Sequence, residues 1–292
     1  LTGASHKKVG PRFIPKILGN IAAANIAIDY NIQGPSFTVS TACSSGGDAI
    51  NTACMCMQSG KADIMLAVGA ESVLCPLVIY SLANAKALSR RNDSPSTASR
   101  PFDVTRDGFV IGEGGGALVL ETEEHALARG AKIYAEIRGC GNTDDAYHVT
   151  APHPEGRGAI ACMKQAIAEA GINPSDIGYI NAHGTATNKG DTVETSSIKK
   201  VFGNTLPYVS STKGATGHMM GAGGITETIT CVKAIETGTV PPTINLNEVD
   251  PECAGIDFVA NTAKKAEINF AMSNAFGFGG QNSSIIVGKY GK

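Results

Sequence analysis

The 292-residue sequence contains no tryptophan, and only 17% of its residues are charged, with a net charge of −2 at pH 7. No apolar run is long enough to suit a membrane-spanning helix, and there is no low-complexity tract. The balanced charge offers no basic surface of the kind that binds nucleic acid. The composition therefore favours an ordinary soluble globular chain, with neither a membrane nor a nucleic acid as its partner.

No C-x-x-C pair or knuckle spacing occurs among the eight cysteines, so their pattern does not indicate a zinc knuckle or a thioredoxin-like redox motif. Several lie in apolar runs, which favours reduced core residues in a reducing compartment; we expect the cytoplasm, with an organelle as the alternative. We expect one of them to take part in chemistry. The cysteines are Cys43, Cys54, Cys56, Cys75, Cys140, Cys162, Cys231 and Cys253.

Apolar strand-like runs alternate with helical patterns along most of the chain, which predicts an α/β fold with a largely parallel sheet covered on both faces. Residues 131–292 contain three strand-helix units before their terminal strands, whereas residues 1–130 show only the last part of that plan. We therefore predict two α/β halves, 1–130 and 131–292. The predicted strands are 63–70, 133–138, 177–182 and 208–211, with strand-like runs in 109–121, and the predicted helices are 20–30, 158–170, 191–202 and 219–236.

Cys43 lies in the stretch T-V-S-T-A-C-S-S-G-G, which is where we expect the chain to change from strand to helix. The run 37–39 is typical of a strand end, and the small residues 44–47 open a helix. The free N–H groups and the dipole at a helix N-terminus favour an anion, which predicts a thiol with a lowered pKa. Cys43 is thus a candidate nucleophile, and an inert buried cysteine is the alternative.

Two histidines lie in similar surroundings, each rich in Gly and Thr and each at a predicted strand end. His183 occurs in N-A-H-G-T-A-T and His218 in S-T-K-G-A-T-G-H. Because the carboxyl ends of strands in a parallel α/β sheet form the ligand-binding edge, we expect both imidazoles to lie near Cys43. No close ligand pair supports a zinc site, so we interpret the set as a nucleophile with two imidazole donors.

Two further stretches carry expectations of their own. The alanine-rich apolar helix 20–30 has little polar face, which predicts that it is buried. The segment S-N-A-F-G-F-G-G-Q-N, residues 273–282, places glycines around two aromatic residues and predicts a gate or an anion-binding turn, or else a β-bulge.

The stretches T-A-C-S-S-G, N-A-H-G-T-A-T, S-T-K-G-A-T-G-H and N-A-F-G-F-G-G-Q-N, in this order and spacing, resemble the four signatures of the β-ketoacyl-acyl-carrier-protein synthases. These are the elongating condensing enzymes of fatty-acid synthesis. The resemblance covers essentially the whole chain. It implies a thiolase-like fold, in which two duplicated mixed-sheet α/β halves form an α-β-α-β-α layering, with the first half incomplete here.

The resemblance also implies a two-step reaction. Cys43 would take an acyl group from acyl-carrier protein, and malonyl-carrier protein would then lose carbon dioxide and condense with that group. His183 and His218 would stabilise the enolate-like oxygen. The oxyanion hole would be formed by the backbone N–H groups of Cys43 and Phe278, with Phe276 and Phe278 as the gate.

Further residues receive roles from the resemblance alone. Lys213, Asp191 and Glu227 would support the imidazoles, and Thr185 and Thr187 would bind the pantetheine arm. No cofactor is required, although a structural Na⁺ or K⁺ is an option. That cation would lie among Asn181, Glu227, Ser273 and Asn274, and the acidic carrier protein would meet Lys7, Lys8, Arg12 and Lys86.

Members of the family are usually homodimers and begin roughly a hundred residues before Leu1, so this chain is expected to expose apolar sheet edges and to be poorly soluble or inactive by itself. Two other interpretations stay open. One is a polyketide-type ketosynthase, and the other is an inactive fragment or subunit that contributes only an interface. The sequence does not indicate the acyl chain length.

Overall fold

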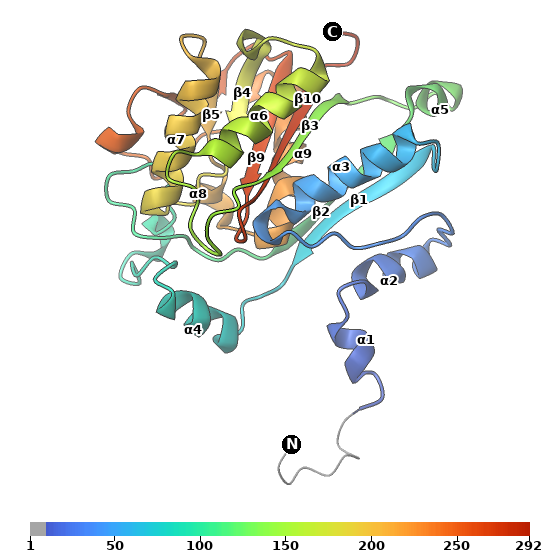
Figure 1. The fold of residues 1–292 in the computed structure, drawn as a ribbon, viewed down its shortest axis with the longest axis horizontal. Helices are drawn as coiled ribbons and strands as arrows, with labels where there is room; N and C mark the ends of the chain where they lie inside the picture. Colours follow the sequence, from blue (N-terminus) through green and yellow to red (C-terminus); the bar gives the residue numbers. More distant parts are fainter. Residues whose placement is uncertain (1–9) are drawn as a thin grey trace.

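A six-stranded mixed sheet forms the centre of the second half of the chain (Figure 1). The computed structural model describes residues 10–292. Strand order is β3-β10-β9-β4-β5-β7; β10 is antiparallel to both β3 and β9, and the last four strands run parallel. The strands are β3 (Glu136–Asp144), β4 (Ile177–Asn181), β5 (Tyr208–Ser210), β7 (Asp257–Phe258), β9 (Phe270–Phe276) and β10 (Gln281–Gly288).

Apolar side chains on both faces of this sheet explain its central position. On β10, Ile285 and Val287 enter one hydrophobic core, whereas Ile286 enters the other. Helices α6 (Arg157–Ala170) and α7 (Asn188–Phe202) supply Met163, Ile198 and other residues to the second core and cover that face. The helix predicted at 158–170 is confirmed as α6, which buries Met163, Ile167 and Ala170 on one side and ends at Gly171, whose φ is +65°.

The opposite face is covered by α3 (Ser45–Gln58) and α9 (Gly223–Thr237), and beyond them lies the antiparallel pair β1 (Ile64–Glu71) and β2 (Gly114–Glu121). The order of layers in residues 10–292 is therefore α-β-α-β. The α/β thiolase-like class is as expected. A fifth helical layer over β1 and β2 is not seen in the described residues, and Ile64, Leu66 and Val119 on that outer face are exposed.

The two central helices cross at their N-terminal ends, where glycines let the backbones meet. A β-carbon on Gly224 of α9 would lie 2.4 Å from the Gly47 nitrogen, and one on Gly46 would lie 2.7 Å from the Ile225 nitrogen. These glycines are required by close approach rather than by an unusual φ angle. The crossing holds the turn before α3 and the turn before α9 against each other.

Shorter elements complete the described chain, and several extend from its edges. The segment with α1 and α2 and the helix α4 project from the body in Figure 1. The division into halves at residue 130 stays a prediction. The elements are α1 (Phe13–Ile17), α2 (Ile21–Asp29), α4 (Pro76–Asn84), α5 (Glu123–Ala128), α8 (Lys213–Thr216), β6 (Thr239–Val240) and β8 (Lys264–Lys265).

Two expectations about the N-terminal region are wrong. The run 37–39 forms no strand, because no strand in the described part of the chain pairs with it. The helix predicted at 20–30 exists as α2 but contains no buried residue, and Ile28 is 76% exposed. An apolar sequence produces burial only where another surface packs tightly against it, whereas Ala22 and Ile26 of α2 line a cavity of about 390 Å³ together with Ile64 of β1.

We predict that Gly224→Ala destabilises the fold by about 1–3 kcal/mol or more, because the new methyl group forces α9 away from α3. Gly223→Ala is the matched control. A β-carbon there would meet only Glu227, at 3.6 Å or more, so we expect a change near zero. Urea unfolding of both variants measures the difference, and equal free energies of unfolding would show that the crossing tolerates a methyl group.

Candidate active site

Cys43 lies in a 3₁₀ turn (Ala42–Ser44) that leads directly into α3. Ala42 has a φ of +51°, in the left-handed region, where a residue with a β-carbon costs about 1–3 kcal/mol. The thiol is buried, with Cys43 only 7% exposed. The turn therefore places the sulfur at the wall of a cavity in a strained conformation that its neighbours must hold.

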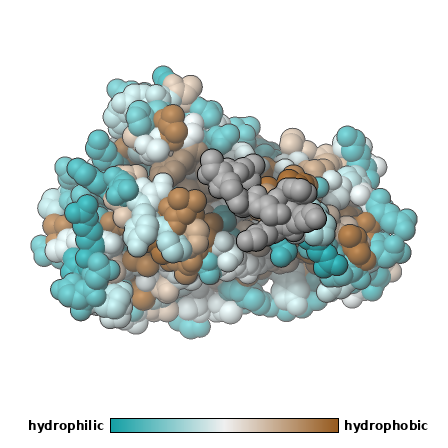
Figure 2. All heavy atoms as spheres, turned by 90° about the horizontal axis from the view of Figure 1, so that it is seen from below, coloured by the Kyte–Doolittle hydropathy of each residue, from teal (hydrophilic) through white to brown (hydrophobic). Residues whose placement is uncertain are grey.

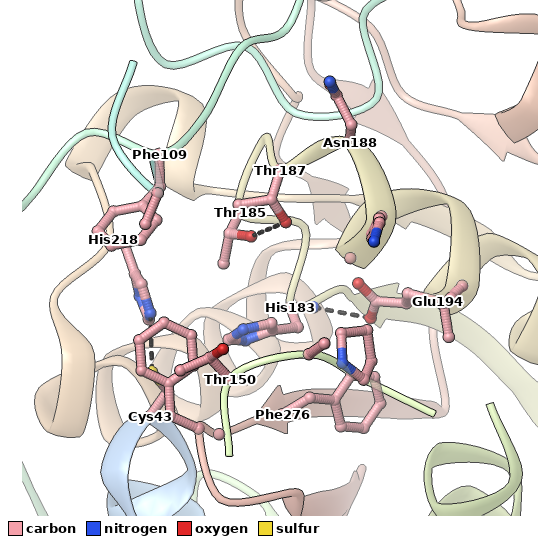
Figure 3. Close-up of a pocket in the computed structure, with 18 of the residues that line it drawn as sticks. Cys43, Phe109, Thr150, His183, Thr185, Thr187, Asn188, Glu194, His218 and Phe276 are labelled. Atoms are coloured by element: carbon pink, nitrogen blue, oxygen red, sulfur yellow. Dashed lines mark hydrogen bonds between the residues drawn. The ribbon is translucent and has the colours of Figure 1, made fainter. Parts of the chain in front are cut away.

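Two imidazoles from the second half reach this thiol (Figure 3). His218 Nε2 lies 3.0 Å from Cys43 Sγ, and the rings of His183 and His218 are nearly perpendicular, with centroids 5.3 Å apart. His183 follows β4. His218 follows α8, and its backbone N–H donates to Val110 O at 2.7 Å. The structure thus brings together the three side chains that the sequence placed at strand ends.

The thiol is not acidified as the sequence led us to expect. Burial raises the pKa of Cys43 to about 11, although a hydrogen bond from the Phe278 N–H and the charge of Lys213 act to lower it. The free-energy cost of desolvating the thiolate outweighs the stabilisation that the helix N-terminus gives to its charge. The resting site therefore contains a neutral thiol.

Both imidazoles are also neutral. Burial lowers the pKa of His183 and of His218 well below the usual value, and the positive charge of Lys213 lowers both further. Neutral imidazoles can each donate one N–H without bringing a charge into the cavity. The site therefore contains two uncharged hydrogen-bond donors beside an uncharged nucleophile.

Lys213 is buried and pairs with the carboxylate of Glu227. Burial raises the pKa of Glu227, whereas the Lys213 charge and hydrogen bond lower it. The other carboxylate oxygen, Glu227 Oε2, and the amide oxygen Asn181 Oδ1 are buried without a partner. Together with buried Ser273 and Asn274, these oxygen atoms are chemically suited to an alkali-metal cation.

Asp191 does not contact the imidazoles, in contrast to the expected role. It is fully buried and accepts hydrogen bonds from the N–H groups of Phe102 (2.8 Å) and Ala186 (3.1 Å), beside the Arg106 guanidinium. Burial raises its pKa to about 6. Asp191 therefore links the loop of Phe102 to the loop of Ala186. Lys213 is the charged group that lowers the pKa of both imidazoles.

The carboxylate that supports His183 is Glu194, which the sequence analysis missed. It accepts hydrogen bonds from the backbone N–H groups of His183 (2.8 Å) and Gly184 (2.7 Å). Burial raises its pKa to about 7. The only signal in the sequence is an acidic residue early in the helix after N-A-H-G-T-A-T, and its partners are backbone groups that a motif does not show.

A cavity of about 570 Å³ opens in front of the thiol. Thr185 and Thr187, whose hydroxyl oxygens are 3.1 Å apart, lie on its wall, as do Phe276 and Phe278. Phe278 is 38% exposed and is flanked by Gly277 and Gly279. The expected binding and gating residues thus share one cavity with the thiol and the imidazoles (Figure 3).

Of the four basic residues expected to meet a carrier protein, the structure describes two, Arg12 and Lys86. Lys86 is exposed and lines the cavity, together with Lys189, which the sequence analysis did not single out. Arg12 lies just before α1 and is not among the lining residues. Lys7 and Lys8 lie outside the described residues.

Comparisons with known proteins agree with this geometry. Residues 1–126 match the model of the beta-ketoacyl synthase N-terminal domain, and residues 134–247 match that of the C-terminal domain. The chain belongs to the β-ketoacyl synthase family.

The relatives of this β-ketoacyl synthase include 3-oxoacyl-[acyl-carrier-protein] synthase 2 of Rhizobium meliloti, which is 47% identical over 97% of the chain and 68% of its own length. The mitochondrial 3-oxoacyl-[acyl-carrier-protein] synthase of Arabidopsis thaliana is 46% identical over 96% of the chain and 62% of its own length.

Solved structures include a β-ketoacyl synthase from Burkholderia phymatum, with a TM-score of 0.93 at 36% identity, covering 99% of this chain and 69% of that one. The ketosynthase of a type II polyketide synthase, solved with its acyl-carrier protein, gives a TM-score of 0.95 at 36% identity and covers 98% and 70% of the two chains.

Two other kinds of site are absent from residues 10–292. No helix there is long and apolar enough to cross a membrane. Within the same residues, no group of three or more His, Cys, Asp or Glu side chains is arranged to hold a metal ion.

The raised pKa of Glu194 leads to a test by pH. Because the pKa of Glu194 is about 7 in the folded state and its ordinary value is 4.5, the unfolded state loses the proton first, and the contribution of Glu194 to stability falls as pH rises from about 4.5 to 7. Glu194→Gln removes this titration. We expect wild type to lose roughly 2–3 kcal/mol relative to the variant between pH 5 and pH 8. Urea unfolding across this range measures the difference, and parallel curves would contradict it.

Proposed function

We propose that this β-ketoacyl synthase catalyses the decarboxylative Claisen condensation of malonyl-acyl-carrier protein with an acyl group bound to Cys43, giving 3-oxoacyl-acyl-carrier protein in fatty-acid elongation. The observation that carries the proposal is the contact between Cys43 Sγ and His218 Nε2, with His183 beside it, in a cavity large enough for a thioester. The relatives named 3-oxoacyl-[acyl-carrier-protein] synthase 2 support it.

In the first step, the Cys43 sulfur attacks the carbonyl of the acyl thioester. The new carbon–sulfur bond forms as the bond to the carrier's sulfur breaks, and the thiol proton leaves with the carrier thiol. Phe278 N–H and His218 Nε2–H stabilise the developing thiolate. The backbone N–H groups of Cys43 and Phe278 then face the oxyanion. Because the free thiol is neutral, proton loss and attack are coupled.

In the second step, the carboxylate of the malonyl group leaves as carbon dioxide, and its bonding electrons form an enolate. The Nε2–H groups of His183 and His218 donate to the enolate oxygen. The carbanion attacks the acyl carbonyl, the bond to Cys43 breaks, and the released thiolate takes a proton from water. Neutral imidazoles serve this step because they stabilise new charge without holding the malonyl carboxylate in an ion pair.

An alkali-metal cation is proposed at the buried oxygens of Asn181, Glu227, Ser273 and Asn274, supported by the unpartnered oxygens of Asn181 and Glu227. When bound, it would offset the Glu227 charge. The condensation itself needs no redox or organic cofactor, because both bonds that form use electron pairs of the substrates.

The carrier protein is proposed to dock at the mouth of the cavity. Lys86 and Lys189 line it and offer positive charge to an acidic partner, while Thr185 and Thr187 offer hydroxyls to the pantetheine arm. The ketosynthase solved with its acyl-carrier protein supports this assignment. We propose the cytoplasm or an organelle interior as the compartment; the relatives named in Arabidopsis thaliana are mitochondrial and chloroplastic.

Polyketide-type ketosynthases remain the second candidate, since they would use the same condensation. The solved polyketide ketosynthase matches at 36% identity, whereas relatives named 3-oxoacyl-[acyl-carrier-protein] synthase 2 match at 47%, which favours fatty-acid elongation. An inactive fragment or subunit is disfavoured because Cys43 and both histidines share one cavity.

The proposed function is tested by separating its two steps. Purified protein is given hexanoyl-carrier protein, and the acylated peptide is mapped by mass spectrometry; malonyl-carrier protein is then added. Because Cys43, His183 and His218 meet in one cavity, we now expect this chain to be active, in contrast to the expectation from the sequence, and we expect the acyl group on Cys43 and none on Cys43→Ala. His183→Ala should still be acylated but should lose about 10²–10³-fold in condensation rate, because one donor to the enolate is removed. Wild type that takes up no acyl group would overturn the assignment.

We also propose a homodimer, supported by the exposed apolar side chains of α2 and α4. Leu77 is 80% exposed and Tyr80 68% exposed. Figure 2 shows apolar residues exposed among polar ones on the underside of the molecule. A second copy would remove this surface from water.

We expect sedimentation equilibrium to show a dimer and Leu77→Asp to weaken it at least about tenfold, which corresponds to about 1.4 kcal/mol. Leu127→Asp, at a residue that is 58% exposed on α5, is the control and should leave the dimer intact. A wild-type chain that is monomeric at all concentrations would exclude this assembly.

A further inference from the structure

Asp48 is a buried carboxylate in the first turn of α3, and the steps above assign it no part. It is 4% exposed and lies five positions after Cys43. Its side chain does not line the cavity. Its hydrogen bonds are directed toward the turn that carries the nucleophile.

Both side-chain oxygens of Asp48 accept hydrogen bonds. Oδ2 accepts from the hydroxyl of Thr41 at 2.5 Å and from the hydroxyl of Ser44 at 3.2 Å. Oδ1 accepts from the side-chain amide of Asn142 at 2.6 Å. One carboxylate thus joins the residues on both sides of Ala42–Cys43 and ties them to β3 in the other half of the chain.

The turn needs such support because of its conformation. Ala42 holds a φ of +51°, which persists only where the surroundings determine it. Ser44 Oγ–H also donates to Thr41 O at 2.7 Å, and Ser45 Oγ–H donates to Ala42 O at 2.7 Å, so hydroxyls close the turn on either side. Within residues 10–292, Asp48 is the side chain whose hydrogen bonds connect these local bonds to a strand of the sheet.

We propose that Asp48 is a positioning residue that holds Cys43 Sγ in line with the oxyanion-hole N–H of Phe278 through Thr41, Ser44 and Asn142. Phe278 follows β9 in the second half, and Asn142 belongs to β3 of the same sheet. The carboxylate therefore places the nucleophile, which comes from the first half, relative to a donor from the second. Asp48 acts through hydrogen bonds, since the charged groups that act on the thiol are Lys213 and Glu227.

The expected effect of Asp48 on acyl transfer rests on the proposed function. Its expected effect on the reactivity of the Cys43 thiol does not. If Asp48→Ala releases the turn, Cys43 becomes hydrated and loses part of the burial that raises its pKa. Alkylation by iodoacetamide at pH 8 then becomes faster, because more thiolate is present. Acyl transfer becomes slower, because the sulfur leaves its alignment with the oxyanion hole. The two rates move in opposite directions.

The experiment measures both rates in wild type, Asp48→Ala, Asp48→Asn and Thr52→Val. We expect Asp48→Ala to alkylate at Cys43 about threefold faster or more, and to be acylated by hexanoyl-carrier protein about 10–100-fold more slowly. Asp48→Asn should stay near wild type, because its amide oxygen can accept from both hydroxyls and the amide of Asn142 can turn to accept from it. Thr52→Val removes a hydrogen bond to the Asp48 backbone without touching the turn and is the control.

Mapping all alkylated cysteines separates positioning from general loosening. Cys231 and Cys253 are buried, and Asp48 is not among the groups that shift the pKa of either thiol, so both should stay unlabelled in Asp48→Ala. If Asp48→Ala does not fold, Thr41→Val serves instead, because it removes one hydrogen-bond donor at the turn. It should show a smaller increase in the alkylation rate and a smaller decrease in the acylation rate.

The positioning role would be overturned if Cys43 were labelled at the wild-type rate in both Asp48→Ala and Thr41→Val. It would also be overturned if every buried cysteine were labelled equally. If wild type takes up no acyl group while Cys43 labelling still responds to Asp48→Ala, the proposed condensation fails and the positioning role stands.

Discussion

The close crossing of α3 and α9 is the constraint on which the rest of the structure depends. The two helices start beside each other because Gly46 and Gly224 leave no β-carbon between their backbones. One helix carries Cys43 at its start, and the other follows directly on the turn that contains His218. If a side chain separated the two helix backbones at this point, the Cys43 sulfur and the His218 imidazole would lie too far apart to form a hydrogen bond.

Burial at this crossing decides the charge state of the site. It keeps the Cys43 thiol and both imidazoles neutral, and it leaves Lys213 paired with Glu227 as the charged centre behind them. In such buried surroundings, a fixed N–H group stabilises a developing oxyanion more strongly than it would in water. The same burial makes the thiol a weaker acid, so the site depends on alignment of the sulfur rather than on a standing thiolate.

The sequence predicted most of the regular elements and the three reactive side chains, because each rests on a local pattern. Alternating strands and helices predicted the sheet, and strand-end loops rich in glycine predicted that His183 and His218 would meet Cys43. Asp191 and Glu194 show the limit. Both are acidic residues early in α7, and only the fold decides that Glu194 supports the His183 loop while Asp191 joins Phe102 to Ala186.

The sequence by itself determined the family signatures, the α/β class and the choice of Cys43 as the candidate nucleophile, since these follow from residue types at short spacing. Tertiary structure alone decided the exposure of α2, the unpaired state of residues 37–39 and the raised pKa of Cys43. Each of these depends on which surfaces lie against a residue, and the free energy of burial or pairing comes from neighbours that are distant in the chain.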